Sequence, residues 1–183
     1  MLTKREDDWK MWSDFITESP WLTHPLPDKF NDDMENIKVE KVLEKYPKIE
    51  TYKNYDIHEN KSEIYFIRDG IISAYYHYSE KPDGSIQTKM TWNNRAHKSS
   101  FRDVFANYII PRFKVVESDI MLTPDAFDLW KRLIAENPQY SFYAKIGEKY
   151  TELEYPHAVY TFKEKMGMND GDNSTFIVTF DKR

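Results

Sequence analysis

The sequence predicts an α+β protein whose mixed, mainly antiparallel sheet is flanked by helices and preceded by an N-terminal helical segment. Apolar residues recur at helical spacing through the first fifty residues, and from Ile49 onward the period becomes that of strands. Farther along the chain, strand-like and helix-like segments alternate. We therefore expect one domain over residues 1–183, with helices in 1–47 and the sheet with two helices in 48–183.

The composition predicts a globular, cytoplasmic protein without membrane contact. Hydrophobic residues make up 40% and charged residues 31% of the 183 residues, a length that buries roughly 70% of the surface of the unfolded chain. No window approaches the roughly 18 apolar residues of a membrane span, and the first ten residues lack the apolar core of a signal peptide. The absence of Cys excludes disulfides, thiolate metal sites and Cys nucleophiles. A net charge of −5 argues against a surface that binds nucleic acid everywhere.

The N-terminal segment is predicted to form two helices separated by a proline-rich loop. Thr3 and Glu6 have the spacing of a capping box, and these apolar residues follow at helical spacing: Trp9, Trp12, Phe15 and Ile16. A second helix is predicted from Asn31, as N-cap, to Tyr46, because Pro47 cannot continue it. The tryptophans of this segment either anchor a protein partner or belong to helices that cover the sheet; they are Trp9, Trp12 and Trp21.

Four strands are predicted next, over residues 49–58, 63–68, 71–79 and 85–93. Asp69-Gly70 lies between two apolar runs and predicts a type I′ hairpin turn, which needs positive φ at both positions. Pro82-Asp83-Gly84 predicts a second turn before the fourth strand. The last three of these strands are therefore expected to be adjacent and antiparallel.

The second half of the chain is predicted to alternate strands and helices. Ser100 and Asp103 have capping-box spacing and begin a helix that Pro111 closes. A strand is predicted over 113–121, and then a helix from Thr123, as N-cap, with Pro124 first, to Asn137-Pro138. The final strands are predicted within SFYAKIGEKYTELEY, AVYTFKEK and STFIVTF, the last two joined by the loop MGMNDGDN.

This order of elements resembles that of the GNAT superfamily of N-acyltransferases over about residues 49–183, and the local match is best in 93–133. The portion ESDIMLTPDAFDLWKRL looks like that of phage GNAT-like proteins, which implies a phage origin and a location in the host cytoplasm. The resemblance implies acyl or aminoacyl transfer to an amine, with acetyl-CoA or another acyl-CoA as the donor. The acceptor amine is then on a protein, a small molecule or a DNA base.

The resemblance places acyl-CoA binding at the start of the helix after the fourth strand. The family holds the pyrophosphate there with R/Q-x-x-G-x-G/A; Arg95 matches the first position, but Lys98 and Ser100 replace the two small residues. Physical chemistry also predicts an anion site, because helix-terminal N–H groups meet cationic and hydroxyl side chains. The residues assigned to the acyl donor are Trp92, Arg95, His97, Lys98, Ser99 and Ser100. The alternative is that Ser100 only caps the helix and the basic residues form a solvated loop.

Acyl transfer to an amine needs a base for the ammonium proton and an acid for the leaving thiolate. The family often supplies the acid from a Tyr in the helix after the fifth strand, but Trp130 stands there. Tyr140 and Tyr143, a little farther on, are the candidate substitutes, of which Tyr143 is assigned the role; each is alternatively a core or surface aromatic. Asp119 is the candidate base, with Ser118 beside it, because both lie at the predicted exit of the fifth strand. Asp119 is alternatively a turn or capping residue.

The sequence leaves two hypotheses for the function, neither of which involves a metal ion. The five histidines are scattered without ligand spacing, so no metal site is expected. The first hypothesis is the transferase just described. The second is an inactive GNAT-like binding or structural phage protein that acts through protein contacts of its Trp-rich N-terminal segment.

Overall fold

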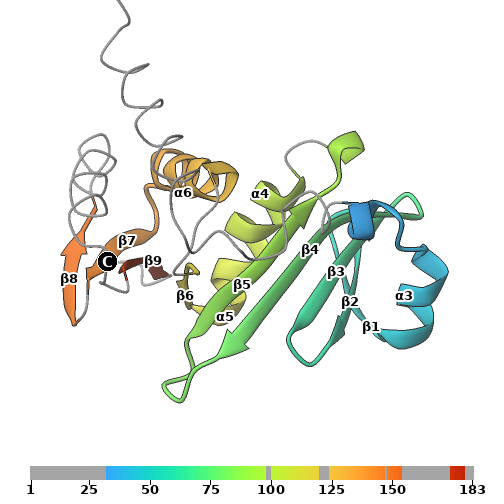
Figure 1. Cartoon of the computed structure of the whole chain (residues 1–183), viewed down its shortest axis with the longest axis horizontal. Coiled ribbons are helices and arrows are strands. Elements are labelled where there is room, and N and C mark those ends of the chain that lie inside the picture. The colour runs from blue at the N-terminus through green and yellow to red at the C-terminus, as the bar shows by residue number, and fades with distance from the viewer. Residues whose placement is uncertain (1–31, 98–99, 120–123, 147, 154–173, 180–183) are drawn as a thin grey trace, which may run out of the picture. The chain divides into compact units, whose positions relative to one another are not determined.

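The computed structural model describes residues 32–97, 100–119, 124–146, 148–153 and 174–179 (Figure 1). The chain divides into two units, Met1–Ile37 and Lys38–Arg183. In the first unit, residues 32–35 are helical. The predicted helix with Trp9 and Trp12, the proline-rich loop and Trp21 lie outside the described residues.

The second unit carries a nine-stranded sheet with helical segments. The strands are β1 (Lys48–Tyr52), β2 (Tyr55–Asn60), β3 (Glu63–Arg68), β4 (Ile71–Glu80), β5 (Ile86–Asn93), β6 (Val115–Glu117), β7 (Ser141–Ile146), β8 (Lys149–Glu152) and β9 (Ser174–Thr179). The helical segments are α3 (Val39–Lys45), the 3₁₀ helix η1 (Arg95–His97), α4 (Ser100–Val104), the π-helix η2 (Phe105–Ile109), α5 (Ile110–Phe113) and α6 (Pro124–Glu136).

The strand order across the sheet is β1-β2-β3-β4-β5-β6-β9-β7-β8. Every neighbouring pair is antiparallel except β5 and β6, which run parallel and pair through Ile86 with Val116 and Gln87 with Glu117. The prediction of an α+β protein with a mainly antiparallel sheet is thus confirmed.

The hairpin turns follow from local backbone requirements. Asp69 and Gly70 have φ of 53° and 72°, so the predicted turn with two positive φ values joins β3 to β4. The prediction of one strand over 49–58 is wrong, because the chain reverses after Tyr52 and returns as β2. Lys53 makes this reversal with a φ of 51°, a conformation that a lysine rarely adopts and that its type does not signal.

The helix predicted over 31–46 is also divided. The backbone of Lys38 is extended, with φ −75° and ψ 129°, so α3 begins only at Val39. It ends at Lys45, one residue before the predicted end at Tyr46, and Pro47 follows this C-cap residue. The extended backbone between the two helical stretches coincides with the boundary between the two units.

Pro111 does not end the helix that begins at Ser100, contrary to the prediction. The helix widens into η2 and continues through α5 to Phe113, so the following strand β6 is shorter than the predicted 113–121. A proline has no N–H group, and its ring crowds the carbonyl one turn earlier. The wider π-helical turn before Pro111 relieves that crowding without ending the helix.

One hydroxyl completes the hydrogen bonding of this widened turn. In η2 the Ile110 N–H reaches back five residues to the Phe105 carbonyl. The Ala106 carbonyl would take its donor from the next residue, but Pro111 has none. The Tyr140 hydroxyl donates to the Ala106 carbonyl instead, at 2.6 Å.

The remaining predicted elements are largely in place. Helix α6 starts at Pro124 and ends at Glu136, just before Asn137-Pro138. The stretch that follows forms the antiparallel hairpin of β7 and β8, and STFIVTF supplies β9. Thr123, the strand predicted in AVYTFKEK and the loop MGMNDGDN lie outside the described residues.

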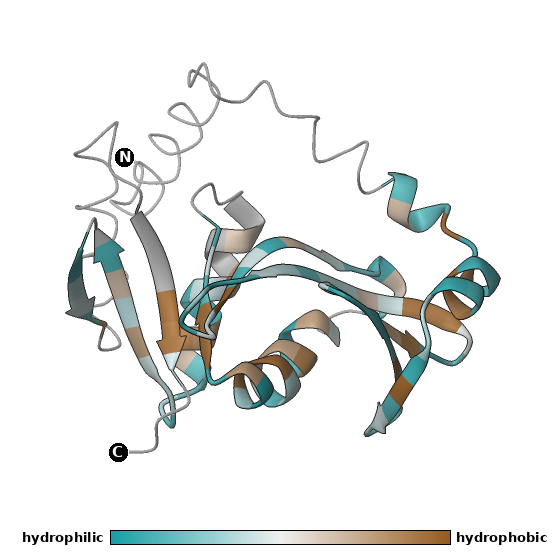
Figure 2. Cartoon of the chain, turned by 90° about the horizontal axis from the view of Figure 1, so that it is seen from below, coloured by the Kyte–Doolittle hydropathy of each residue, from teal (hydrophilic) through white to brown (hydrophobic). Residues whose placement is uncertain are grey.

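The main core lies between one face of the sheet and the helical segments α4, η2, α5 and α6. Figure 2 shows hydrophobic residues along the helical segments that lie against the sheet. Phe105 is central, with its ring centroid 5.7 Å from that of Tyr76 on β4 and 5.8 Å from that of Trp130 on α6. Trp130, at the position where the resemblance implies a catalytic Tyr, is therefore a buried packing residue.

We expect Tyr140→Phe to lower the free energy of unfolding by about 1 to 3 kcal/mol, because the buried Ala106 carbonyl loses its donor. Chemical denaturation of the two proteins measures the difference. Tyr150→Phe is the matched control, because Tyr150 is 59% exposed and its change should stay within about 0.5 kcal/mol. Equal losses in the two variants would contradict the role assigned to the Tyr140 hydroxyl.

Candidate functional site

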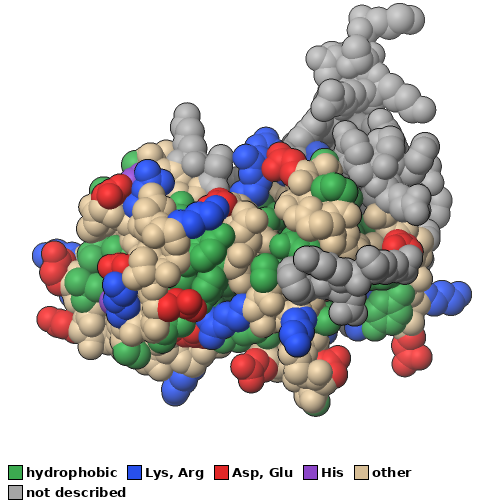
Figure 3. Space-filling model, turned by 180° about the vertical axis from the view of Figure 1, so that it is seen from behind, with side chains coloured by type: hydrophobic (Ala, Val, Ile, Leu, Met, Phe, Trp, Pro, Cys, Tyr) green, Lys and Arg blue, Asp and Glu red, His purple; other side chains and the backbone are tan. Residues whose placement is uncertain are grey.

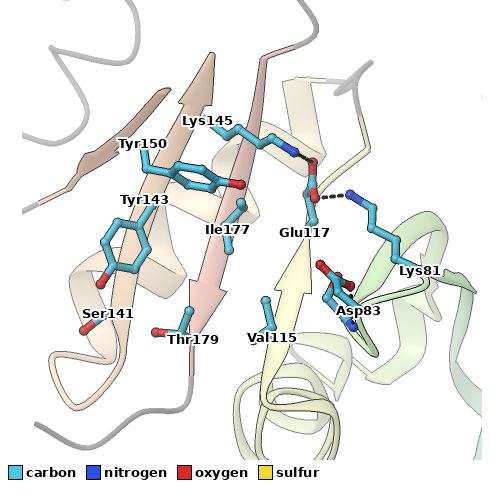
Figure 4. A pocket seen from close by; sticks show the side chains of 11 residues that line it. Lys81, Asp83, Val115, Glu117, Ser141, Tyr143, Lys145, Tyr150, Ile177 and Thr179 are labelled. Atoms are coloured by element: carbon cyan, nitrogen blue, oxygen red, sulfur yellow. Dashed lines mark hydrogen bonds and ion pairs between the residues drawn. The ribbon is translucent and has the colours of Figure 1, made fainter. Parts of the chain in front are cut away.

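A pocket of about 570 Å³ lies on the face of the sheet opposite the helical core, across β6, β9 and β7 (Figure 4). Strand alternation explains the position: Val116 and Val178 face the core, so Glu117 and Ile177 face the other way. The hairpin between β4 and β5 forms another wall through Lys81, Asp83 and Ser85. The pocket therefore joins residues from both sides of the parallel strand pair.

Glu117 is the most enclosed charge in the pocket, with a side chain only 8% exposed. The Lys81 ammonium donates a hydrogen bond to one of its oxygens, and the Lys145 ammonium lies 3.8 Å from the other (Figure 4). A buried carboxylate is costly unless cations and donors compensate it. Because Lys81 precedes β5 and Glu117 ends β6, the ion pair crosses the parallel junction.

Tyr143, a predicted catalytic residue, lines this pocket. Its hydroxyl and those of Ser141 and Thr179 form no hydrogen bonds within the described part of the chain. The ring of Tyr150 extends from β8 toward Ile177 (Figure 4), and its centroid lies 5.8 Å from the Lys145 ammonium. The pocket thus combines charged groups, hydroxyls and an aromatic ring.

The other two predicted catalytic residues follow β6 and do not line the pocket. Ser118 is fully buried, and its hydroxyl donates to the Asp119 carbonyl at 2.9 Å. The Gln87 side-chain amide approaches the Ser118 carbonyl at 3.4 Å. Asp119 is half-buried at the end of the described segment. The structure therefore places Tyr143 in the pocket and leaves Ser118 and Asp119 at the point where β6 ends.

Sequence reasoning missed Glu117, although it carried a signal. The residue stands inside the apolar run FKVVESDIM, where a carboxylate at a buried position needs a cationic partner. The partner Lys81 lies 36 residues earlier in the chain, so spacing gave no indication of the pair.

The predicted acyl-donor residues lie around the end of β5. Trp92 is buried on the face away from the helical core, where it pairs with Tyr75 of β4. Arg95 and His97 are in η1, and the His97 ring nitrogen Nδ1 lies 2.7 Å from the Ser73 hydroxyl oxygen. Lys98 and Ser99 lie outside the described residues.

The predicted capping box at Ser100 and Asp103 does not form. Ser100 is buried, and its hydroxyl oxygen accepts from the Tyr55 hydroxyl at 3.1 Å. The Phe101 N–H donates instead to the side-chain oxygen of Asn93 at 2.8 Å. One helix-terminal N–H is therefore already satisfied by a protein oxygen. The carboxylate of Asp103 binds the Lys53 ammonium at 2.8 Å.

The edge of β5 opens beside this helix start. Parallel pairing with β6 stops at Gln87, and no described residue after Glu117 continues the ladder along β5. The Asn94 N–H donates to the Ser73 carbonyl on β4. Because antiparallel strands alternate their donors, the Trp92 N–H also points to β4, whereas the N–H groups of Thr91 and Asn93 point to the opposite edge. These two amides face the side from which β6 has departed.

A carboxylate and three tyrosines form a separate cluster between the end of α3 and strands β3 and β4. Glu63 accepts hydrogen bonds from the hydroxyls of Tyr46 at 2.6 Å and Tyr75 at 2.8 Å, and the ring of Tyr65 packs between theirs. Burial alone would raise the pKa of Glu63, but the two hydroxyl donors outweigh it and hold the pKa below its usual 4.5. Burial and the nearby carboxylate raise the pKa of Tyr75. The cluster is a set of satisfied polar groups with a structural role.

Comparison with known proteins identifies no family for this chain. Models of protein families, curated proteins and solved structures were all compared with the chain, and none of them matches it. Among the described residues, no three His, Asp or Glu side chains are grouped to hold a metal ion. None of the helices described is at once long and apolar enough to cross a membrane. On the face drawn in Figure 3, acidic and basic side chains are interspersed and do not gather by sign.

We expect Glu63→Gln to destabilise the protein at neutral pH by an amount that shrinks as the pH falls. The lowered pKa of Glu63 means that its contribution to stability is complete above 4.5 and is lost as the pH falls through the folded-state value. Urea denaturation of both proteins between pH 7 and pH 3 measures the difference. Glu44→Gln is the control, because Glu44 is exposed on α3 and makes no ion pair with another described residue. A destabilisation by Glu63→Gln that stays constant with pH would refute this account.

Proposed function

We propose that this protein transfers an acyl group from acyl-CoA to an amine, as the GNAT-like order of its elements suggests. The observation that carries the proposal is the parallel pair of β5 and β6. These strands pair over two residues each, no described residue after Glu117 extends the pairing, and η1 and α4 follow β5 along the chain. A strand edge whose N–H groups have no partner among the described residues, beside a helix start, suits an extended, anionic ligand.

The acyl donor would use two features of this opening. Its pantetheine arm contains amide groups, which match the outward N–H groups of Thr91 and Asn93 in the manner of an added strand. Its diphosphate would lie near Arg95, with the ring of His97 in the same 3₁₀ helix as a further polar group. The Phe101 N–H is bonded to Asn93, so the cationic side chains contribute more to this contact than in a glycine-rich loop.

The chemistry would be completed by groups that follow β6 and by one on β7. The acceptor nitrogen forms a bond to the thioester carbonyl carbon, the carbon–sulfur bond breaks, and the ammonium proton must pass to a base. Asp119 is the proposed base, because it follows β6 where the strands separate. Ser118 is its neighbour, and Tyr143 is the proposed proton donor to the thiolate.

A second function is favoured by two departures from this pattern. The helix start is capped by Asn93, and Trp130 fills the core where the resemblance implies a catalytic Tyr. Both departures are expected of a protein that keeps the fold and has lost acyl transfer. The second candidate is accordingly an inactive GNAT-like phage protein that acts through binding.

Calorimetric titration with acetyl-CoA tests the first function. We expect saturable binding that Arg95→Ala weakens roughly tenfold, because a charged hydrogen bond to phosphate is lost. Arg132→Ala is the matched control, because Arg132 is exposed on α6 and its substitution removes the same charge. An absence of binding at millimolar acetyl-CoA would overturn the transferase proposal and favour the binding protein.

A further inference from the structure

We propose that the pocket beside Glu117 binds a small organic molecule through a carboxylate or phosphate group held by Lys145 and Lys81. The inference does not rest on acyl transfer. It follows from the charges, donors and size of a pocket on the face of the sheet opposite the helical core.

The first step is the arrangement of Lys81 and Lys145 around Glu117. One carboxylate faces two ammonium groups, and Lys81 already donates a hydrogen bond to it. Lys145 lies 3.8 Å from the carboxylate, beyond hydrogen-bond distance, so its three N–H donors are not used by Glu117. No other described residue accepts a hydrogen bond from Lys145; its further contact is with the ring of Tyr150. Lys145 therefore retains donors and positive charge for a ligand.

Asp83, the other acid among the described residues that line the pocket, interacts with Lys81 and Ser85, not with Lys145. Asp83 is exposed on the hairpin, where water screens it. One of its oxygens accepts from the Ser85 N–H at 3.0 Å and from the Ser85 hydroxyl at 2.6 Å. Asp83 thus shapes the turn, whereas the Lys145 side chain is only 26% exposed and faces less water.

Further hydrogen-bond donors and the volume of the pocket indicate the chemistry and the size of the ligand. The hydroxyls of Ser141 and Thr179 have no hydrogen-bond partner among the described residues, and anionic oxygens are good acceptors for them. A volume of about 570 Å³ exceeds that of one inorganic anion and lies in the range of small-molecule sites. Tyr150 and Ile177 offer apolar contact to the rest of such a molecule.

Two-dimensional NMR titration of the full chain with inorganic phosphate and, separately, with succinate tests the proposal. We expect saturable shifts of backbone amides in β7 and β9 with at least one probe, and the responding probe identifies the acidic group. Lys145→Met should weaken this binding roughly tenfold or more, since the main charged donor is removed while Lys81 still pairs with Glu117. Lys145→Arg should retain part of it.

The matched control is Lys149→Met, because Lys149 is exposed on β8 and does not line the pocket. It loses the same charge and should leave the affinity unchanged. The proposal is overturned if neither anion gives saturable shifts in β7 and β9. It is also overturned if Lys145→Met binds as tightly as the unchanged protein, or if Lys149→Met loses as much affinity.

Discussion

The two-residue parallel junction between β5 and β6 is the constraint on which the rest of the structure depends. It joins the antiparallel strands β1 to β5 to the group formed by β6, β9, β7 and β8. Such a short ladder supplies few hydrogen bonds, so packing must secure it. Ile86 and Val116 are fully buried in one core with the helical segments. On the opposite face, the ion pair of Lys81 with Glu117 crosses the same junction.

The junction and the pocket have a common origin in the alternation of side chains along β6. Val116 faces the core, so Glu117 must face the other side and be compensated there. Its two cations come from different parts of the sheet: Lys81 from the hairpin before β5, and Lys145 from β7. The pairing that stabilises the buried carboxylate therefore also brings together the walls of the pocket. Lys145 is the second cation beside Glu117, and at 3.8 Å it makes no hydrogen bond to that carboxylate.

Local chemistry made much of the fold predictable. The turn at Asp69-Gly70 and the limits of α6 at Pro124 and Asn137-Pro138 follow from backbone requirements of single residues. The reversal at Lys53 was missed because a lysine does not signal positive φ. The helix continues past Pro111 because the widened turn and the distant Tyr140 hydroxyl accommodate the missing N–H, and no local pattern contains that partner.

The candidate site was less predictable, because it depends on tertiary pairing. The sequence placed Tyr143 among the reactive residues, and the structure puts it in the pocket. Trp92 and Ser100 are buried by neighbours that their spacing in the sequence did not reveal. Glu117 is a candidate site residue only because the fold brings it close to two lysines that are distant in the sequence.

Amide hydrogen exchange in β5, measured by NMR without ligand, tests the central claim that the sheet opens beyond Gln87. The Trp92 N–H points to β4 and should exchange slowly, whereas those of Thr91 and Asn93 point to the open edge and should exchange much faster. Protection of Thr91 and Asn93 equal to that of Trp92 would show that the edge is paired, and would contradict the account.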